Sequence, residues 1–263
     1  MLRLSRWFAL CAVVLGAVAC RDKKPENLAP AASALAPVAP MAAQAVTLSV
    51  DAESSKVAFL MQAPVEKISG DAPASLSGEV FVVADDLAKS TALVKVDLEK
   101  LTLYQEKRED EKAAFSERKK NDLQNEHART WLEISSDTPE NVRSENRFAE
   151  FRITRLEAPS VPSVQALSGA ERKLVATAVG DFRLHGRKSE KKVKLELSFQ
   201  YQGDKLSGVH ARTLEPLQIG LEEFDVRPRE AFGKLAQKTL SALGSKVAQV
   251  APIEIDFSAR SKQ

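Results

Sequence analysis

The sequence predicts a mainly β fold: a single antiparallel β-barrel of about eight strands with one or two accessory helices. From Val46 onward, successive segments place apolar residues at every second position, which is typical of strands with one buried face. Turn-forming pairs such as His185-Gly186 and Gln202-Gly203 separate these segments. Many strands joined by hairpin-type turns favour a closed antiparallel sheet.

Residues 1–19 have the pattern of a secretory signal peptide. Arg3 and Arg6 precede an apolar run over residues 7–15, and small residues follow it. The apolar run is too short to span a bilayer, which needs about 20 residues. The sequence therefore predicts export.

The end of the signal, Ala17-Val18-Ala19-Cys20, resembles a bacterial lipoprotein box, in which the cysteine thiol receives a diacylglycerol. An ordinary secretory signal cut after Ala19 is the alternative. Cys11 would leave with the signal and Cys20 would be acylated, so no free thiol would remain, which suits an oxidising compartment. We expect a lipoprotein on the periplasmic face of a bacterial membrane. Arg21 stands where inner-membrane lipoproteins often have aspartate, which favours the outer membrane.

The stretch that follows, residues 20–45, is rich in alanine and proline and shows no strand or helix period. Proline favours an extended polyproline conformation of about 3.1 Å per residue. The sequence therefore predicts that Cys20 is joined through an extended tether to one barrel domain, residues 46–263.

Two segments break the strand pattern and predict helices. Residues 105–130 are charged throughout, with Phe115 and Leu123 as isolated large apolar residues, and are expected to form a solvated helix that could contain a break. Residues 228–247 are expected to form an amphipathic helix. Its apolar positions are Phe232, Leu235, Ala236, Leu240, Leu243 and Val247.

No motif in the chain carries recognisable catalytic or metal-binding chemistry. His127, His185 and His210 have no metal-ligand spacing, and no G-x-S-x-G elbow, phosphate-binding loop or dinucleotide fingerprint occurs. Without Arg3 and Arg6, 36 basic residues remain of 38, equal to the 36 acidic residues, so the formal charge falls from +2 to zero. A neutral chain is a poor candidate for nucleic-acid binding, which depends on phosphate neutralisation. We expect neither an enzyme nor a metal site nor a nucleic-acid partner.

The stretch VGDFRLHGRKSEKKVKLELSF, residues 179–199, reads as two strands joined by a charged turn. Phe182 and Leu184 share one face of the first strand, whereas Arg183 and His185 lie on the other face. We expect His185 to be a turn residue on the polar side of the sheet.

The order of these segments resembles the YceI-like family of exported lipid-binding proteins. The resemblance rests on Ser55-Lys56-Val57-Ala58-Phe59, on the region from Gly70 to Val80, on NDLQNEHARTWLEI, on RFAEFRI, on VGDFRLHGRKSEKKVKLEL and on PIEIDF. It implies a lipocalin-like barrel whose long apolar cavity holds an isoprenoid lipid, such as a polyprenyl or quinone tail, and no other cofactor. The segments 156–173 and 228–247 are longer than the family needs, and the second would cap the cavity mouth or occupy part of it.

The inward apolar positions of the strands are the candidate lining of that cavity, with plain core packing as their alternative role. They are Val57, Phe59, Val80, Val82, Phe151, Ile153, Phe182, Leu184, Leu195, Leu197 and Phe199. Val80 and Val82 are chosen over Phe81 and Val83, although all four are apolar and the strand register is ambiguous.

Three functions are compatible with these observations. A membrane-anchored carrier of an isoprenoid-type lipid is favoured. An envelope scaffold with a filled barrel, which would dock a protein partner, is the alternative, and a hydrolase or isomerase working inside the barrel is the least favoured. A homodimer is compatible with the first two.

Overall fold

A computed structural model of the chain describes residues 28–227 and 249–261. The predicted signal peptide, Cys20 and the predicted helix 228–247 lie outside the described residues. All strand pairings within the described part are antiparallel. The strands are β1 (Val46–Ala63), β2 (Glu66–Asp71), β3 (Leu76–Val82), β4 (Thr91–Asp97), β5 (Thr102–Lys107), β6 (Lys119–Lys120), β7 (Phe148–Glu157), β8 (Glu171–Leu184), β9 (Arg187–Gln202), β10 (Lys205–Thr213), β11 (Leu217–Gly220) and β12 (Val250–Arg260).

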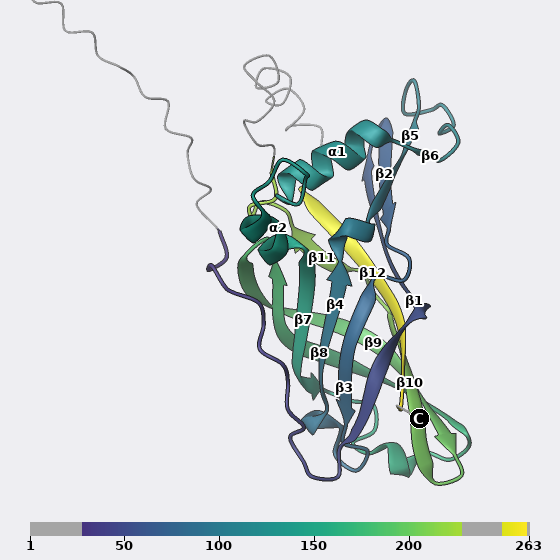
Figure 1. Cartoon of the computed structure of the whole chain (residues 1–263). Helices are drawn as coiled ribbons and strands as arrows, with labels where there is room; N and C mark the ends of the chain where they lie inside the picture. Colours follow the sequence, from purple (N-terminus) through teal and green to yellow (C-terminus); the bar gives the residue numbers. More distant parts are fainter. Residues whose placement is uncertain (1–27, 228–248, 262–263) are drawn as a thin grey trace, which may run out of the picture.

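Eight of these strands close into a barrel in the order β12-β10-β9-β8-β7-β4-β3-β1, and β1 pairs with β12 to complete the ring. The predicted barrel of about eight strands is therefore confirmed. β1 is long enough to pair with β3 through its first residues and with β2 through its last. As a result, β2, β5 and β6 extend the wall at one end, where β11 also pairs with β12 (Figure 1).

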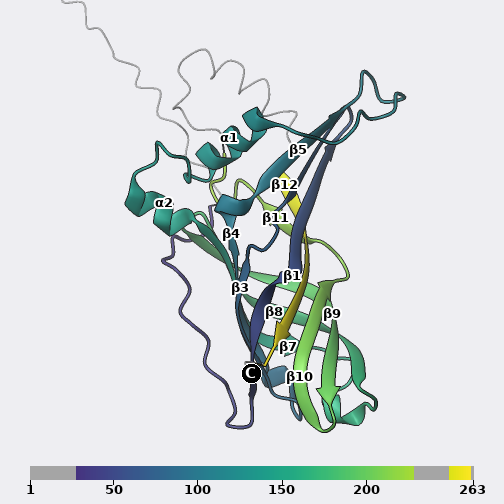
Figure 2. The same ribbon diagram turned by 45° about the vertical axis from the view of Figure 1, so that its right-hand side comes forward.

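Two α-helices, α1 (Asp122–Trp131) and α2 (Glu140–Asn146), lie at this extended end of the barrel (Figures 1 and 2). The stretch 105–130 therefore differs from its prediction, because only its last third, from Asp122 onward, is helical. Its first residues complete β5, which pairs with β2 along its whole length. The side chain of Asn121 caps the helix by accepting a hydrogen bond from the Gln124 N–H at 3.0 Å.

The opposite end of the barrel is closed by the segment between β7 and β8. Val164, in a short 3₁₀ turn of residues 164–166, is fully buried, and its N–H donates to the Ala84 carbonyl at 2.8 Å. The Leu87 N–H donates to the Pro162 carbonyl at 3.0 Å. The long segment 156–173 is thus packed against this end, which we call the floor.

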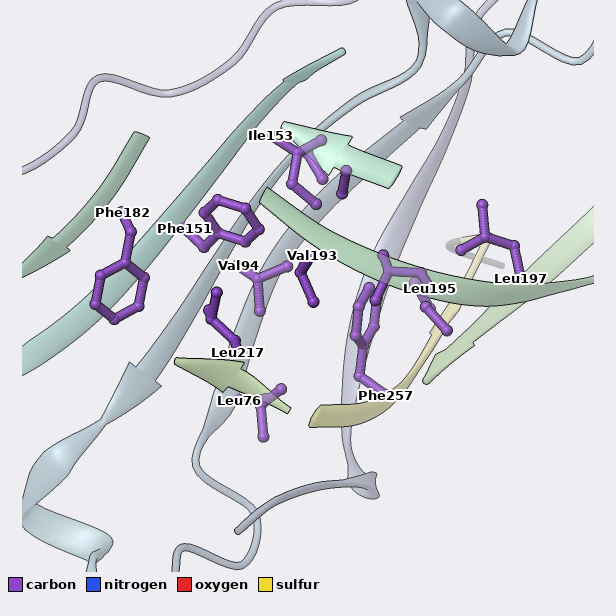
Figure 3. Packing of buried hydrophobic residues seen from close by; sticks show 14 of the residues in the cluster. Leu76, Val94, Phe151, Ile153, Phe182, Val193, Leu195, Leu197, Leu217 and Phe257 are labelled. Atoms are coloured by element: carbon purple, nitrogen blue, oxygen red, sulfur yellow. The ribbon is translucent and has the colours of Figure 1, made fainter. Parts of the chain in front are cut away.

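The strand alternation places the expected residues inside. Val80 packs against the main core cluster and Val82 belongs to it, whereas Phe81 and Val83 are buried outside that cluster. On β8, Phe182 and Leu184 also belong to the cluster. Figure 3 shows side chains from several strands pointing into one shared interior.

The described part of the alanine- and proline-rich segment packs on the barrel. Residues 29–45, which we call the N-terminal strap, run down the outside of the barrel from the helix-bearing end to the start of β1 (Figure 1). The Ala29 N–H donates to the Glu223 carbonyl and the Ala32 N–H to the Gly186 carbonyl, both at 2.8 Å. Leu35 is buried. Packing and backbone hydrogen bonds thus hold the strap against the barrel.

The strap covers a row of polar residues on the outer face of β4, β7 and β8. Glu150 and Arg183 are each 1% exposed, and Lys95 donates to Glu150 with its ammonium 2.9 Å from the carboxylate. The Leu35 N–H donates to the same carboxylate at 2.8 Å, and the Arg183 Nε donates to the Ala32 carbonyl at 2.9 Å. The outward polar face predicted for Arg183 is correct, but the strap shields it from water.

Candidate ligand-binding cavity

The barrel contains an apolar cavity of about 560 Å³ in the half nearest the helices. This volume lies within the usual range for small-molecule sites, about 300–1,000 Å³. Most of its wall is formed by side chains of β1, β4, β7, β8, β9 and β12, and residues of β2, β5, β10 and β11 also line it. The deeper wall consists of Val57, Phe59, Val94, Phe151, Ile153, Phe182, Val193, Leu195, Ile253, Ile255 and Phe257.

Of the positions chosen from the sequence, seven line this cavity. They are Val57, Phe59, Phe151, Ile153, Phe182, Leu184 and Leu195. The other four, Val80, Val82, Leu197 and Phe199, do not line it. On β9 the cavity wall includes Val193 and Leu195 but not Leu197 or Phe199, which sets the depth of the cavity along this strand.

Below that depth the interior is filled by the protein's own side chains. Leu48, Leu76 and Val82 share the main core cluster with Leu197 and Phe199. Protein interiors are packed as densely as organic crystals. A ligand can therefore bind only where the barrel is wide enough for its inward side chains to leave space empty. Alternation along a strand selects the inward face but does not tell which inward residues border empty space.

Helix α1 lies across the open end of the cavity, which we call the mouth (Figure 2). Gln124, His127, Ala128 and Trp131 all line the cavity, and their spacing places them on one face of the helix. The rings of His127 and Trp131 are stacked with centroids 6.3 Å apart.

Asn125, which is buried, fixes α1 to the barrel wall. Its amide oxygen accepts from the Leu103 N–H at 2.8 Å, and its amide nitrogen donates to the Leu103 carbonyl at 2.9 Å. Both backbone groups of this β5 residue are thereby satisfied by one helix side chain. The position of the helix over the mouth is therefore set by specific hydrogen bonds as well as by packing.

Polar side chains of the lining are concentrated at the mouth. They are Glu66, Gln124, His127, Glu222, Arg227 and Gln249. The one charged residue among the deeper strand positions is Glu150, and its carboxylate is bound on the outer face by the Leu35 N–H and the Lys95 ammonium. An amphiphile fits such an arrangement, with its apolar part in the barrel and its polar end at the mouth.

His185 occupies the turn between β8 and β9 beside this mouth, with a φ of 49°. Its Nδ1 lies 3.1 Å from the carbonyl oxygen of Phe224 and its Nε2 lies 2.8 Å from a carboxylate oxygen of Glu133. The side chain is buried, contrary to the expected exposure on a polar face, because the turn at residues 221–225 and the end of α1 pack over it. It joins three segments of the rim and does not line the cavity.

The rim also holds an ion pair between Glu223 and Lys191, whose ammonium lies 2.7 and 2.9 Å from the two carboxylate oxygens. Burial raises the pKa of Glu223, but the hydrogen bonds from Lys191 and Ser189 outweigh burial, so the pKa lies below its ordinary value. The carbonyl of the same residue accepts the Ala29 N–H of the strap. Glu223 thus contacts both the cavity rim and the strap.

Within residues 28–227 and 249–261, no group of three or more His, Cys, Asp and Glu side chains is placed to hold a metal ion. No helix of this part of the chain has the length and apolar character needed to cross a membrane.

No protein-family model matches the sequence, and no curated protein matches it significantly. Solved structures do match. A polyisoprenoid binding domain from Saccharophagus degradans, implicated in plant cell wall breakdown, has a TM-score of 0.50 and 14% identity over 82% of this chain and 99% of that chain. The first likeness establishes the fold. The crystal structure of Burkholderia cenocepacia BcnA gives a TM-score of 0.45 and 14% identity, over 81% of this chain and 99% of that one.

The lipocalin-like barrel implied by the YceI-like resemblance is therefore confirmed at the level of fold. The residues of α1 at the mouth were not among the candidates from the sequence, because the charges around them indicated a solvated helix. Their spacing, at positions 124, 127, 128 and 131, was the signal that could have found them. In the same way, Leu217 and Ile219 alternate as a strand and both line the cavity.

Proposed function

We propose that this protein binds an isoprenoid-type lipid in its barrel cavity and is anchored, through acylated Cys20, to the periplasmic face of a bacterial membrane, the outer membrane in preference to the inner. The observation that carries lipid binding is the shape and chemistry of the cavity: it is largely apolar in depth, blocked by the floor, and has most of its polar side chains at the mouth. The structurally similar domain from Saccharophagus degradans is described as polyisoprenoid binding, which supports the same class of ligand here.

The anchor rests on the sequence alone. Residues 1–19 have the composition of a signal peptide, and Cys20 follows Ala17-Val18-Ala19. A diacylated cysteine buries enough methylene groups, at about 0.8 kcal/mol each, for stable attachment. We propose a binding protein rather than an enzyme. Among the described residues, the deeper lining is apolar apart from Glu150, whose carboxylate is held on the outer face by the Leu35 N–H and Lys95.

The test compares two substitutions on β9. Val193 faces the cavity, whereas Lys194, the next residue, faces solvent and lies near Glu215. The full chain, exported through its own signal, would be purified from membranes, and its bound lipid extracted and measured by mass spectrometry. We expect a ladder of isoprene-spaced masses from the wild type and Lys194→Phe, and its loss from Val193→Phe.

The same preparation reports on the anchor. The mass of the N-terminal peptide would show a diacylglyceryl group on Cys20 if the lipoprotein proposal is right. Absence of any extractable lipid from wild-type protein, even after incubation with quinones and polyprenyl lipids, would overturn the carrier proposal and favour the envelope scaffold.

A further inference from the structure

The N-terminal strap begins beside the cavity mouth. Ala29 donates to the carbonyl of Glu223, which follows the lining residue Glu222. Ala32 donates to the carbonyl of Gly186 in the turn that follows the lining residue Leu184. The Arg187 Nη1 donates to the Ala29 carbonyl at 2.8 Å. The chain therefore arrives from Cys20 at the rim of the mouth and only then runs down to the floor.

The chain between Cys20 and Ala29 is too short to reverse this orientation. Nine residue steps reach at most about 30 Å when fully extended, at about 3.3–3.6 Å each. β9 runs from the mouth at Arg187 to the floor end at Gln202, 16 residues or about 50 Å along the strand. With a strand tilt of about 40°, the height of the barrel is still about 38 Å. If the floor faced the membrane, an anchor on Cys20 could not reach the bilayer.

Two arrangements remain: the mouth faces the bilayer, or the barrel lies with its side against it. Exposed apolar side chains distinguish between them. Of the six large hydrophobic residues that are exposed in the described chain, four lie at the mouth end. These are Leu60 at 46%, Val65 at 43%, Leu123 at 58% and Val250 at 41% exposed. They come from β1, the β1–β2 turn, α1 and the start of β12, which gather at this end in both views of the ribbon (Figures 1 and 2). Apolar side chains in such positions are suited to the interfacial region of a bilayer.

We propose that the strap and the anchor hold the cavity mouth against the bilayer in which Cys20 is embedded, so that the lipid ligand enters the barrel directly from that same membrane. The partner of the mouth is therefore a lipid surface, contacted by the β1–β2 turn and α1. This inference rests on the acylation of Cys20 and adds to it the direction in which the barrel faces.

The test places a fluorescent label at each end of the barrel. The sequence has two cysteines, Cys11 and Cys20, so an introduced cysteine is the one free thiol of the acylated chain. Val65→Cys marks the mouth end and Asp204→Cys, in the exposed β9–β10 turn, marks the floor end. The acylated protein would be reconstituted in phosphatidylethanolamine–phosphatidylglycerol vesicles that contain nitroxide-labelled headgroups. We expect quenching at residue 65 to exceed quenching at residue 204 several-fold. Equal quenching, or stronger quenching at residue 204, would overturn the inference.

A longer linker tests whether the short connection to Cys20, rather than the surface of the mouth itself, sets the orientation of the barrel. Inserting 24 glycine and serine residues between Cys20 and Leu28 adds a flexible coil of about 27 Å root-mean-square length. We expect quenching at residue 65 to fall to about the value at residue 204. Quenching that persists at full strength would show that the short connection does not set the orientation, and would overturn that part of the proposal.

Two further readouts distinguish failure of this inference from failure of the proposed function. Flotation with the vesicles and the mass of the N-terminal peptide report acylation, and the extracted lipid reports occupancy of the cavity. If acylation and bound lipid are both present while the two labels are quenched equally, the orientation alone is wrong. If either is missing from the wild type, the proposed function itself fails.

Discussion

At the scale of single residues, the carboxylate of Glu150 is a buried charge that depends on its hydrogen-bond and ion-pair partners. It is buried beneath the strap and is bound by the Leu35 N–H, by Lys95 and, at 3.7 Å, by the guanidinium of Arg183. A buried charge is tolerated only when partners replace its lost hydration. Removing the Glu150 carboxylate deprives the Leu35 N–H of its acceptor and leaves the buried guanidinium of Arg183 without this counter-charge.

We therefore expect Glu150→Ala to lower the free energy of unfolding by about 3–5 kcal/mol, the usual cost of breaking a buried ion pair. Glu157→Ala, on the same strand but with its carboxylate at the surface beside Lys192, is the matched control and should change stability little. Urea unfolding of the two variants at pH 7 measures the difference. Equal effects would show that the strap does not isolate Glu150 from water.

Asp97 provides a pH-dependent contribution to stability. Burial raises the pKa of its carboxyl, but hydrogen bonds from Arg147, at 2.7 and 3.1 Å, and from the Glu99 N–H outweigh burial, so the pKa lies below its ordinary value. Because the folded pKa is the lower one, the stabilisation is complete above the unfolded pKa of about 3.9 and is lost as the pH falls through the folded value.

We expect Asp97→Asn to reduce stability at pH 7 by about 1–3 kcal/mol, as for hydrogen bonds to a charged group. The gap between variant and wild type should shrink as the pH falls below about 4, since the wild-type carboxyl then becomes protonated. Urea midpoints measured from pH 7 to pH 2.5 provide the check. A gap of constant size across this range would contradict the assignment.

At the scale of elements, the strap and α1 show where the sequence was informative and where it was not. Period-two alternation predicted the strands and the inward register of β3, even where Phe81 and Val83 are also apolar. Composition predicted an extended segment over residues 20–45, but it could not predict that residues 29–45 pack on the barrel, because most of their hydrogen-bond partners lie more than 100 positions away in the sequence. The position of the cavity was likewise beyond the sequence, since the volume left between inward side chains depends on how the whole barrel closes.

Leu35 is the larger of the two apolar side chains that the strap buries against the barrel, the other being Ala29, and it is 8% exposed. We expect Leu35→Ala to cost about 2 kcal/mol, at the low end of the range for buried leucine. Met41→Ala, in the same segment but 60% exposed, should be close to neutral. Urea unfolding compares them, and limited proteolysis within residues 29–45 should cleave the Leu35 variant faster than the Met41 variant.

At the scale of the whole molecule, the barrel divides into a packed half near the floor and an open half near the mouth. Leu197 and Phe199 pack in the half near the floor, whereas Val193 and Leu195 line the cavity in the half near the mouth. Filling the open half with a ligand would add apolar contacts that the protein alone does not make. Ligand binding should therefore stabilise the folded state without a change of fold.

A lipid present at 100 times its dissociation constant raises the free energy of unfolding by about 2.7 kcal/mol. For a chain of this size we expect a rise in melting temperature of about 5–10 °C over the delipidated protein, by differential scanning calorimetry. Lys194→Phe should keep this rise and Val193→Phe should lose it. A rise of equal size in both variants would place the lipid elsewhere than in the cavity.

The strap also determines which bonds a pulling force on the N-terminal chain loads first. Tension applied to the chain ahead of Ala29 would act first on the hydrogen bonds to Glu223 and Gly186 at the rim, and then on those to Glu150 and Arg183, before any force reached Val46. These bonds would be loaded along the outer wall, and the seam between β1 and β12 that closes the barrel would carry none of the pull until the strap had peeled away. A pull on the N-terminal end of the strap would therefore strain the barrel at its rim while its closure stayed unloaded.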